Sequence, residues 1–278
     1  MHLKLMYITN CPKVAEIAEN AGVDRIFVDL EYIGKDARQG GMDTVKSHHT
    51  IDDVKRIKTA IKKSELLVRV NPIHESTDEY VSSEGEIDAV IKNGADIVML
   101  PYFKTVEEVE RFIKVVNGRA KTMLLVETPE AVKIIDDILN IEGIDECHIG
   151  INDLSLGYGR KFMFELVADG TVEKLCKKIG GSGRPFGFGG IAALGKGLIP
   201  AESIIIEHYR VGSSMAILSR SFCNTEKTND LAVIKNIFHD GVKNIRDFEE
   251  RVQNGEFSFE ENFNDLREKV RKIVGRQV

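Results

Sequence analysis

The chain alternates short apolar, β-branched segments with longer helical patterns, and this alternation limits the folds open to it. Near-continuous apolar strands that each precede a helix are typical of parallel sheets covered on both faces. Eight such β-then-α units predict a closed (β/α)8 TIM barrel with extra helices at the C-terminal end. The predicted strands are residues 3–8, 25–30, 65–70, 96–100, 122–126, 146–151, 185–190 and 214–218.

Several residues mark where the predicted helices begin and end. Thr50 and Asp53 form the pattern of a capping box, which opens a helix. Gly22, Gly94 and Gly143 each follow a helical pattern and precede a strand, where helix-ending glycines occur. These signals support the alternation of strands and helices.

The end of the chain carries two apolar stripes at helical spacing and no strand signal. We therefore predict a barrel at residues 1–225 and a helical extension at residues 226–278. The final helix has no obvious place on the barrel wall, so we expect it to cap the barrel bottom or to pack on a neighbouring subunit of a homo-oligomer. The stripes are Ile234, Ile237, Phe238, Val242 and Ile245, and then Phe259, Phe263, Leu266, Val270 and Ile273.

Composition narrows the class of protein. The net charge of −6 argues against nucleic acid as the main partner. No apolar run approaches the roughly 20 residues of a membrane span, and the first residues lack the apolar core of a signal peptide. The four cysteines show no CxxC spacing, as expected of reduced thiols. We expect a cytoplasmic protein with a small-molecule substrate.

Charged side chains follow several predicted strands, at the end of the barrel where such enzymes place their chemistry. Glu127 ends the apolar run 123–126. A buried strand can end in a carboxylate only if the charge is neutralised or reached by water. Asp153 follows the next strand, and Arg69 lies at the end of the third. Because these strand ends share one rim, we expect the three side chains in one site.

Glu127 and Asp153 would suit a divalent cation that prefers oxygen ligands. We favour Mg²⁺ or Mn²⁺ over zinc, because no cluster of His or Cys accompanies the two carboxylates. Such a metal can polarise the carbonyl of a bound 2-oxo acid and stabilise its enolate. Arg69 could add a fixed positive charge near the same oxygen. The backbone N–H groups around Gly150 and Asn152 could hold the substrate carboxylate.

Four segments resemble the metal-dependent pyruvate aldolase and citrate lyase β-chain family, a group of phosphoenolpyruvate/pyruvate-binding barrels. They are residues 27–31, 68–71, 125–128 and 150–155, and their order and spacing agree with that family. The resemblance covers about residues 3–220. It implies that Glu127 and Asp153 bind the metal and that Arg69 contacts the enolate oxygen. It also implies that the backbone near Gly150 and Asn152 binds the carboxylate, and that C-terminal helices are exchanged between subunits.

The chain departs from the aldolases at two positions. Tyr32 stands where they usually have a His that takes part in acid–base chemistry, and Leu125 stands where they often have Gln. Asp29 and Glu31 instead resemble the Asp-Leu-Glu of citrate lyase β-chains, and we place both among the substrate-binding residues.

The long loop at residues 34–49 offers a replacement for the missing histidine. It contains Lys35, Arg38, His48 and His49. We predict that His49 moves the proton, because this loop follows the same strand and could fold over the mouth. Tyr32 acting through a water is the alternative, and a simple polar loop before Thr50 is another. His148 lies within a strand, and we expect it to be a packed histidine rather than a ligand.

These patterns predict a Mg²⁺- or Mn²⁺-dependent carbon–carbon lyase, or aldolase, that acts on a 2-oxo acid through a pyruvate-type enolate. We assign catalytic roles to Arg69, His49 and Tyr32. One alternative is a lyase or synthase for CoA thioesters, as Asp29 and Glu31 suggest. Another is a non-catalytic relative that binds metal and 2-oxo acid. A glycine-rich stretch at residues 187–192 fits a dinucleotide fingerprint only weakly.

Overall fold

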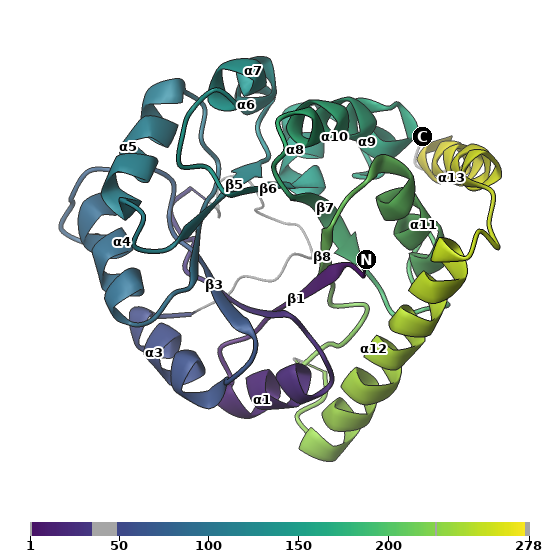
Figure 1. The fold of residues 1–278 in the computed structure, drawn as a ribbon, viewed down its shortest axis with the longest axis horizontal. Helices are drawn as coiled ribbons and strands as arrows, with labels where there is room; N and C mark the ends of the chain where they lie inside the picture. Colours follow the sequence, from purple (N-terminus) through teal and green to yellow (C-terminus); the bar gives the residue numbers. More distant parts are fainter. Residues whose placement is uncertain (1, 35–48, 226, 276–278) are drawn as a thin grey trace.

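The computed structural model describes residues 2–34, 49–225 and 227–275, and it forms a closed barrel of eight parallel strands surrounded by helices (Figure 1). Each strand pairs with the next, and β8 pairs with β1 to close the barrel. The predicted TIM barrel is therefore confirmed, with each strand within two residues of its predicted bounds. The strands are β1 (Lys4–Ile8), β2 (Arg25–Asp29), β3 (Glu65–Arg69), β4 (Ile97–Leu100), β5 (Lys121–Val126), β6 (Glu146–Ile149), β7 (Phe186–Ile191) and β8 (Met215–Leu218).

Most of the helices form a ring outside the strands (Figure 1). Thr50 opens α3 with the predicted capping box to Asp53. Within the described residues, no helix combines the length and the apolar composition that crossing a lipid bilayer requires. The helices are α1 (Pro12–Asn20), α3 (Ile51–Ala60), α4 (Ser83–Lys92), α5 (Val106–Val116), α6 (Pro129–Lys133), α7 (Ile135–Ile138), α8 (Ile151–Gly157), α9 (Glu165–Ala168), α10 (Thr171–Gly181), α11 (Ala201–Val211), α12 (Leu231–Gln253) and α13 (Phe259–Gly275).

Buried apolar side chains form two separate clusters. The larger one contains apolar residues of both the helices and the strands. The smaller one takes the alternate strand positions, which face the barrel interior. Its fully or almost fully buried members are Met6, Phe27, Leu67, Ile97, Met99, Met123, Leu125 and Met215. On β2, Phe27 lies between two charged residues, Arg25 and Asp29, that point to the same side of the strand. On β3, Leu67 lies between Glu65 and Arg69 in the same way. The barrel interior is therefore apolar in the middle and charged towards both ends.

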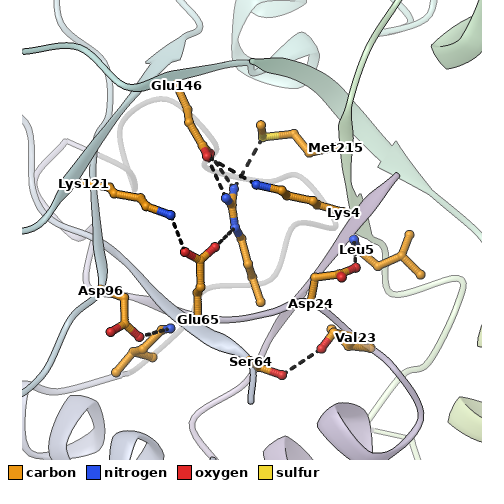
Figure 2. Close-up of polar contacts among 12 residues, drawn as sticks. Lys4, Leu5, Val23, Asp24, Ser64, Glu65, Asp96, Lys121, Glu146 and Met215 are labelled. Atoms are coloured by element: carbon orange, nitrogen blue, oxygen red, sulfur yellow. Dashed lines mark hydrogen bonds and ion pairs between the residues drawn. The ribbon is translucent and has the colours of Figure 1, made fainter. Parts of the chain in front are cut away.

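The amino ends of the strands are joined by a buried network of charges (Figure 2). Arg25 is completely buried and donates two hydrogen bonds to Glu146, at 2.6 and 2.7 Å, and one to Glu65 at 2.9 Å. Lys121 donates to Glu65 at 2.6 Å, and Lys4 lies 3.7 Å from Glu146. The network links β1, β2, β3, β5 and β6 and fills the barrel at the end opposite the expected site.

Helix α12 takes the place of the eighth barrel helix. It follows β8 and packs between α1 and α11 (Figure 1). Ile234, Phe238, Val242 and Ile245 of its predicted stripe are buried. The predicted division of the chain at residue 225 stays a prediction. Helix α12 lies beyond that boundary, yet it packs on the barrel helices α1 and α11.

Helix α13 lies outside the ring, against α9 and α11 of its own chain (Figure 1). Leu266 and Val270 are buried there, and Asn262 donates to the backbone carbonyl of Ser203 at 3.0 Å. The expectation that the last helix caps the barrel bottom is wrong, because its apolar stripe packs on the outer wall of the barrel, against α9 and α11. Exchange of this helix between subunits stays a prediction.

Replacing Arg25 tests the charged network. Arg25→Met keeps much of the volume but leaves Glu146 buried without its closest cation, so we expect the free energy of unfolding to fall by about 3–5 kcal/mol. Arg56→Met is the matched control, because the Arg56 side chain is 60% exposed and its pair with Asp53 should contribute below about 1 kcal/mol. Urea denaturation measures both variants, and equal losses would contradict the prediction.

Candidate functional site

A cavity of about 460 Å³ opens at the carboxyl ends of the strands. Its wall includes Arg69 at the end of β3, Glu127 just after β5, and Asn152 and Asp153 in the first turn of α8. The barrel therefore brings together the three charged residues that the sequence placed on one rim, and Asn152 joins them.

Glu127 is held by the backbone of the neighbouring strand connection. Its carboxylate is almost completely buried, and its Oε1 accepts a hydrogen bond of 3.0 Å from the backbone N–H of Tyr102. Tyr102 has a φ of 50°, in the left-handed region that residues other than glycine rarely adopt. Such strained residues concentrate at functional sites. The hydroxyl of Thr128 donates to Phe103 at 2.8 Å and fixes the backbone immediately after Glu127.

Gly150 makes room for Glu127 at the start of α8. A Cβ at residue 150 would lie 2.7 Å from Oε2 of Glu127 and 2.7 Å from its Cβ. The φ of Gly150 is an ordinary −81°, so space rather than conformation requires glycine here. The carboxylate of Glu127 therefore lies against the backbone that begins the helix carrying Asp153.

The donor set of the cavity fits a magnesium-like cation. Mg²⁺ is usually bound through one or two carboxylates and keeps several waters. Glu127 and Asp153 supply two such carboxylates, and the space left by Gly150 lets Glu127 lie against the start of α8, whose first turn carries Asp153. Among the described residues, no group of three or more His, Cys, Asp or Glu side chains has the arrangement of a metal cage. The pair therefore suits Mg²⁺ or Mn²⁺ better than a structural zinc.

Arg69 is fixed by two acids. It forms a bidentate pair with Asp29, with both N···O distances at 2.8 Å, and its Nη1 lies 3.2 Å from Glu31. Burial alone would lower the pKa of Arg69, but Asp29 and then Glu31 hold it well above its ordinary value. Arg69 is therefore a permanent cation with a fixed direction. Asp29 and Glu31 are buried against it, and their predicted contact with substrate stays a prediction.

Tyr32 and His49 border a second cavity, of about 500 Å³, and do not line the first. The Nδ1 of His49 accepts a hydrogen bond of 3.0 Å from the backbone N–H of Asp29, so a neutral His49 carries its proton on Nε2. The Tyr32 hydroxyl donates to the backbone carbonyl of His49. Burial and the charge of Asp29 raise the pKa of Tyr32. Lys35, Arg38 and His48 lie outside the described residues.

The start of α8 offers backbone donors to the cavity. The N–H of Gly150 is used, because it donates to Val126 at 3.0 Å. The N–H groups of Ile151 and Asn152 come next, in the first turn, where helix geometry provides no acceptor within the helix. Binding of a substrate carboxylate by this backbone stays a prediction. The N–H groups of Ile151 and Asn152 are the donors that we expect to take part.

His148 also reaches the cavity wall but is almost completely buried. Its Nε2 lies 3.1 Å from the backbone carbonyl of Gly189, and burial lowers its pKa to about 4. A neutral, packed histidine is therefore what the structure contains. The sequence pattern assigned no role to Tyr102, or to Arg220, which lies at the predicted end of the eighth strand and lines the cavity. Nothing in the sequence signals the left-handed backbone of Tyr102.

A family model described as HpcH/HpaI aldolase/citrate lyase matches residues 4–188, about two thirds of the chain. The chain therefore belongs to the HpcH/HpaI aldolase/citrate lyase family.

Two curated relatives are similar to parts of the chain. A hydroxypyruvate/pyruvate aldolase from Roseovarius nubinhibens is 23% identical over 160 residues, which cover 53% of this chain and 61% of that protein. A 4-hydroxy-4-methyl-2-oxoglutarate aldolase, cghB, from Chaetomium globosum is 25% identical over 215 residues, covering 65% of this chain and 72% of the relative. The match thus spans less than two thirds of the first relative's length.

Solved structures share the fold at low identity. An HpcH/HpaI aldolase from Desulfitobacterium hafniense has a TM-score of 0.60 at 18% identity, covering 88% of this chain and 93% of that one. The citrate synthase SbnG has a TM-score of 0.59 at 17% identity, covering 84% and 94%. Macrophomate synthase has a TM-score of 0.54 at 15% identity, covering 78% and 77%. These likenesses are to the barrel fold.

Gly150→Ala tests the geometry of the site. The added methyl group would displace Glu127, so we expect Mn²⁺ affinity to fall at least about tenfold, a change of about 1.4 kcal/mol. Gly181→Ala is the matched control, because a Cβ there meets nothing within 4 Å and its φ is not positive. Calorimetric titration measures both. Unchanged affinity in Gly150→Ala would separate Glu127 from the metal.

Proposed function

We propose that the protein is a divalent-metal-dependent carbon–carbon lyase of the aldolase class. It would cleave or form a bond next to the carbonyl of a 2-oxo acid, through a pyruvate-type enolate. The observation that carries the proposal is the single cavity lined by Glu127, Asp153 and Arg69. Membership in an aldolase and lyase family supports it, and both curated relatives described above are aldolases by name.

Each polar group of the cavity has a part in this reaction. Glu127 and Asp153 would hold Mg²⁺ or Mn²⁺, which supplies Lewis-acid polarisation of the substrate carbonyl when it is bound. Arg69 directs a fixed positive charge at the oxygen that becomes the enolate. Because Asp29 and Glu31 already hold the guanidinium, little reorganisation is needed as negative charge develops.

Proton transfer is assigned to His49, with Tyr32 as a positioning residue. Imidazole is the side chain best suited to accept and return a proton near neutral pH, whereas a phenol is a poor base there. The Tyr32 hydroxyl bonds the backbone carbonyl of His49 and thereby fixes the residue rather than the substrate. The Nδ1 of His49 accepts a hydrogen bond from the backbone N–H of Asp29, so His49 lies next to the strand end that carries the Asp29–Arg69 pair.

A lyase or synthase acting on CoA thioesters is the second candidate. It is favoured by Asp29 and Glu31, which match the citrate lyase pattern and both contact Arg69. Comparison of acyl-CoA substrates with pyruvate plus aldehydes separates this candidate from the aldolase. A non-catalytic relative would bind metal and pyruvate and turn over neither. The cytoplasmic location and the homo-oligomer, with α13 exchanged between subunits, belong to the proposal as well.

The two carboxylates provide the first test of the proposal. Glu127→Gln and Asp153→Asn should each abolish Mn²⁺ binding in calorimetry, because each removes one charged ligand of the cation. Both variants should also stop the wild-type exchange of pyruvate methyl protons in D₂O, followed by NMR. Thermal unfolding serves as the control for folding. If Mn²⁺ binds equally well to either variant, that residue is not a ligand.

His49→Ala tests the proton carrier. General acid–base catalysis contributes about 10²–10⁴-fold, so we expect kcat for methyl-proton exchange to fall about 100-fold or more. The affinity for pyruvate should be retained, because Arg69 and the metal ligands, rather than His49, would hold pyruvate. Tyr32→Phe should lower kcat less. Normal turnover by His49→Ala would remove this residue from the mechanism.

A further inference from the structure

We propose that the cavity takes an acceptor with an apolar body, such as a medium-chain aliphatic aldehyde, rather than one that carries a second charge. This inference rests on the proposed aldolase function and adds the substrate class on the acceptor side. It is drawn from the part of the cavity that the metal ligands and Arg69 do not use.

The wall beyond the charged centre is apolar on two sides. One side is the connection from α8 to α9, which supplies Phe162, Met163 and Phe164. The rings of Phe162 and Phe164 pack edge to face, with centroids 5.3 Å apart, so this wall is a pre-formed surface. The other side is the connection from β7 to α11, which supplies Leu198 and Ile199.

Leu198 is the clearest sign of an apolar ligand. Its side chain is 74% exposed, although it lines the cavity. Two glycines just before it shape the turn: Gly195 has a φ of +73° and Gly197 a φ of +97°. A Cβ at residue 197 would lie 2.5 Å from the carbonyl oxygen of Ile199. The turn thus holds Leu198 at the mouth of the cavity. There its side chain contributes nothing to the core but can cover an apolar ligand.

The size of the cavity leaves room for such an acceptor. Its volume of about 460 Å³ lies in the range of sites for drug-sized ligands, whereas pyruvate has only three carbons. Ser219, Arg220 and Ser221 also line the cavity, so whether Arg220 favours a charged acceptor is decided by the 4-oxobutanoate comparison below. Apolar side chains make up most of the remaining wall beyond the metal ligands and Arg69.

The reaction balances without a further reagent. A base removes one methyl proton from pyruvate, and the enolate carbon forms a bond to the aldehyde carbon. The aldehyde oxygen then takes up a proton and becomes a hydroxyl group, which gives a 4-hydroxy-2-oxo acid with an apolar chain. Cleavage is the reverse, in which that carbon–carbon bond breaks and the aldehyde leaves.

A series of aldehydes tests the inference on the full-length protein with Mn²⁺ and pyruvate. The probes are acetaldehyde, butanal, hexanal and 4-oxobutanoate, which has the length of butanal but ends in a carboxylate. We expect kcat/KM to rise about threefold to fourfold per buried methylene from acetaldehyde to hexanal. We expect 4-oxobutanoate to react at least about tenfold more slowly than butanal, because its charge would lose water against an apolar wall.

Leu198→Ser provides the matching variant. The exposed side chain can be replaced without opening the core, so we expect the ratio of kcat/KM for hexanal to that for acetaldehyde to fall about tenfold. Val233→Ser on α12 is the control, since Val233 is 44% exposed and does not line this cavity, and it should leave the ratio unchanged.

The outcomes separate this inference from the proposed function. Methyl-proton exchange of pyruvate in D₂O needs no acceptor. If the wild type exchanges these protons but prefers 4-oxobutanoate, or shows no gain with chain length, the apolar acceptor is overturned and the lyase stands. An unchanged ratio in Leu198→Ser also overturns the inference. If the wild type exchanges no protons, the proposed function falls and the inference falls with it.

Discussion

The pairing of Arg69 with Asp29 and Glu31 is the interaction around which the candidate site is organised. Asp29 and Arg69 lie opposite each other in the register of β2 and β3, so the strand pairing itself delivers the acid to the guanidinium. Burying a cation is costly unless it is paired and hydrogen-bonded, and two carboxylates meet that condition here. The charge therefore stays in the barrel mouth with a fixed direction, which suits the stabilisation of a developing anion.

The same alternation of side chains produces opposite results at the two ends of the barrel. At the amino ends, Arg25, Glu65 and Glu146 bind one another, and the network closes the interior. At the carboxyl ends, Glu127 and Asp153 line a cavity. A (β/α)8 barrel separates stability from chemistry in this way. The amino ends of the strands are tightly packed, whereas the carboxyl ends lead into the loops that form the site.

The sequence predicted what depends on periodicity. Eight apolar runs give eight strands, and the residue that follows each run must lie on the rim, which is why Glu127, Asp153 and Arg69 could be placed together. It could not predict strand register, so the pairing of Asp29 and Glu31 with Arg69 was not foreseen. The sequence also did not predict the course of the loop backbone. This course sets the second cavity beside His49 and Tyr32, and it sets the strained Tyr102 against Glu127.

Parts of the cavity wall have different structural origins, and this bears on how a member of the family acquires its own substrate. The charged residues come from the ends of β3, β5 and β6, all within the matched residues 4–188, which also include the apolar wall at residues 162–164. Leu198 and Ile199, in contrast, lie on a connection beyond that match, in the turn held by Gly195 and Gly197. Barrel loops can change without disturbing the strands that carry the chemistry. The strand ends that carry the charged residues can therefore be kept while such a connection changes, and Leu198 lies on a connection of that kind.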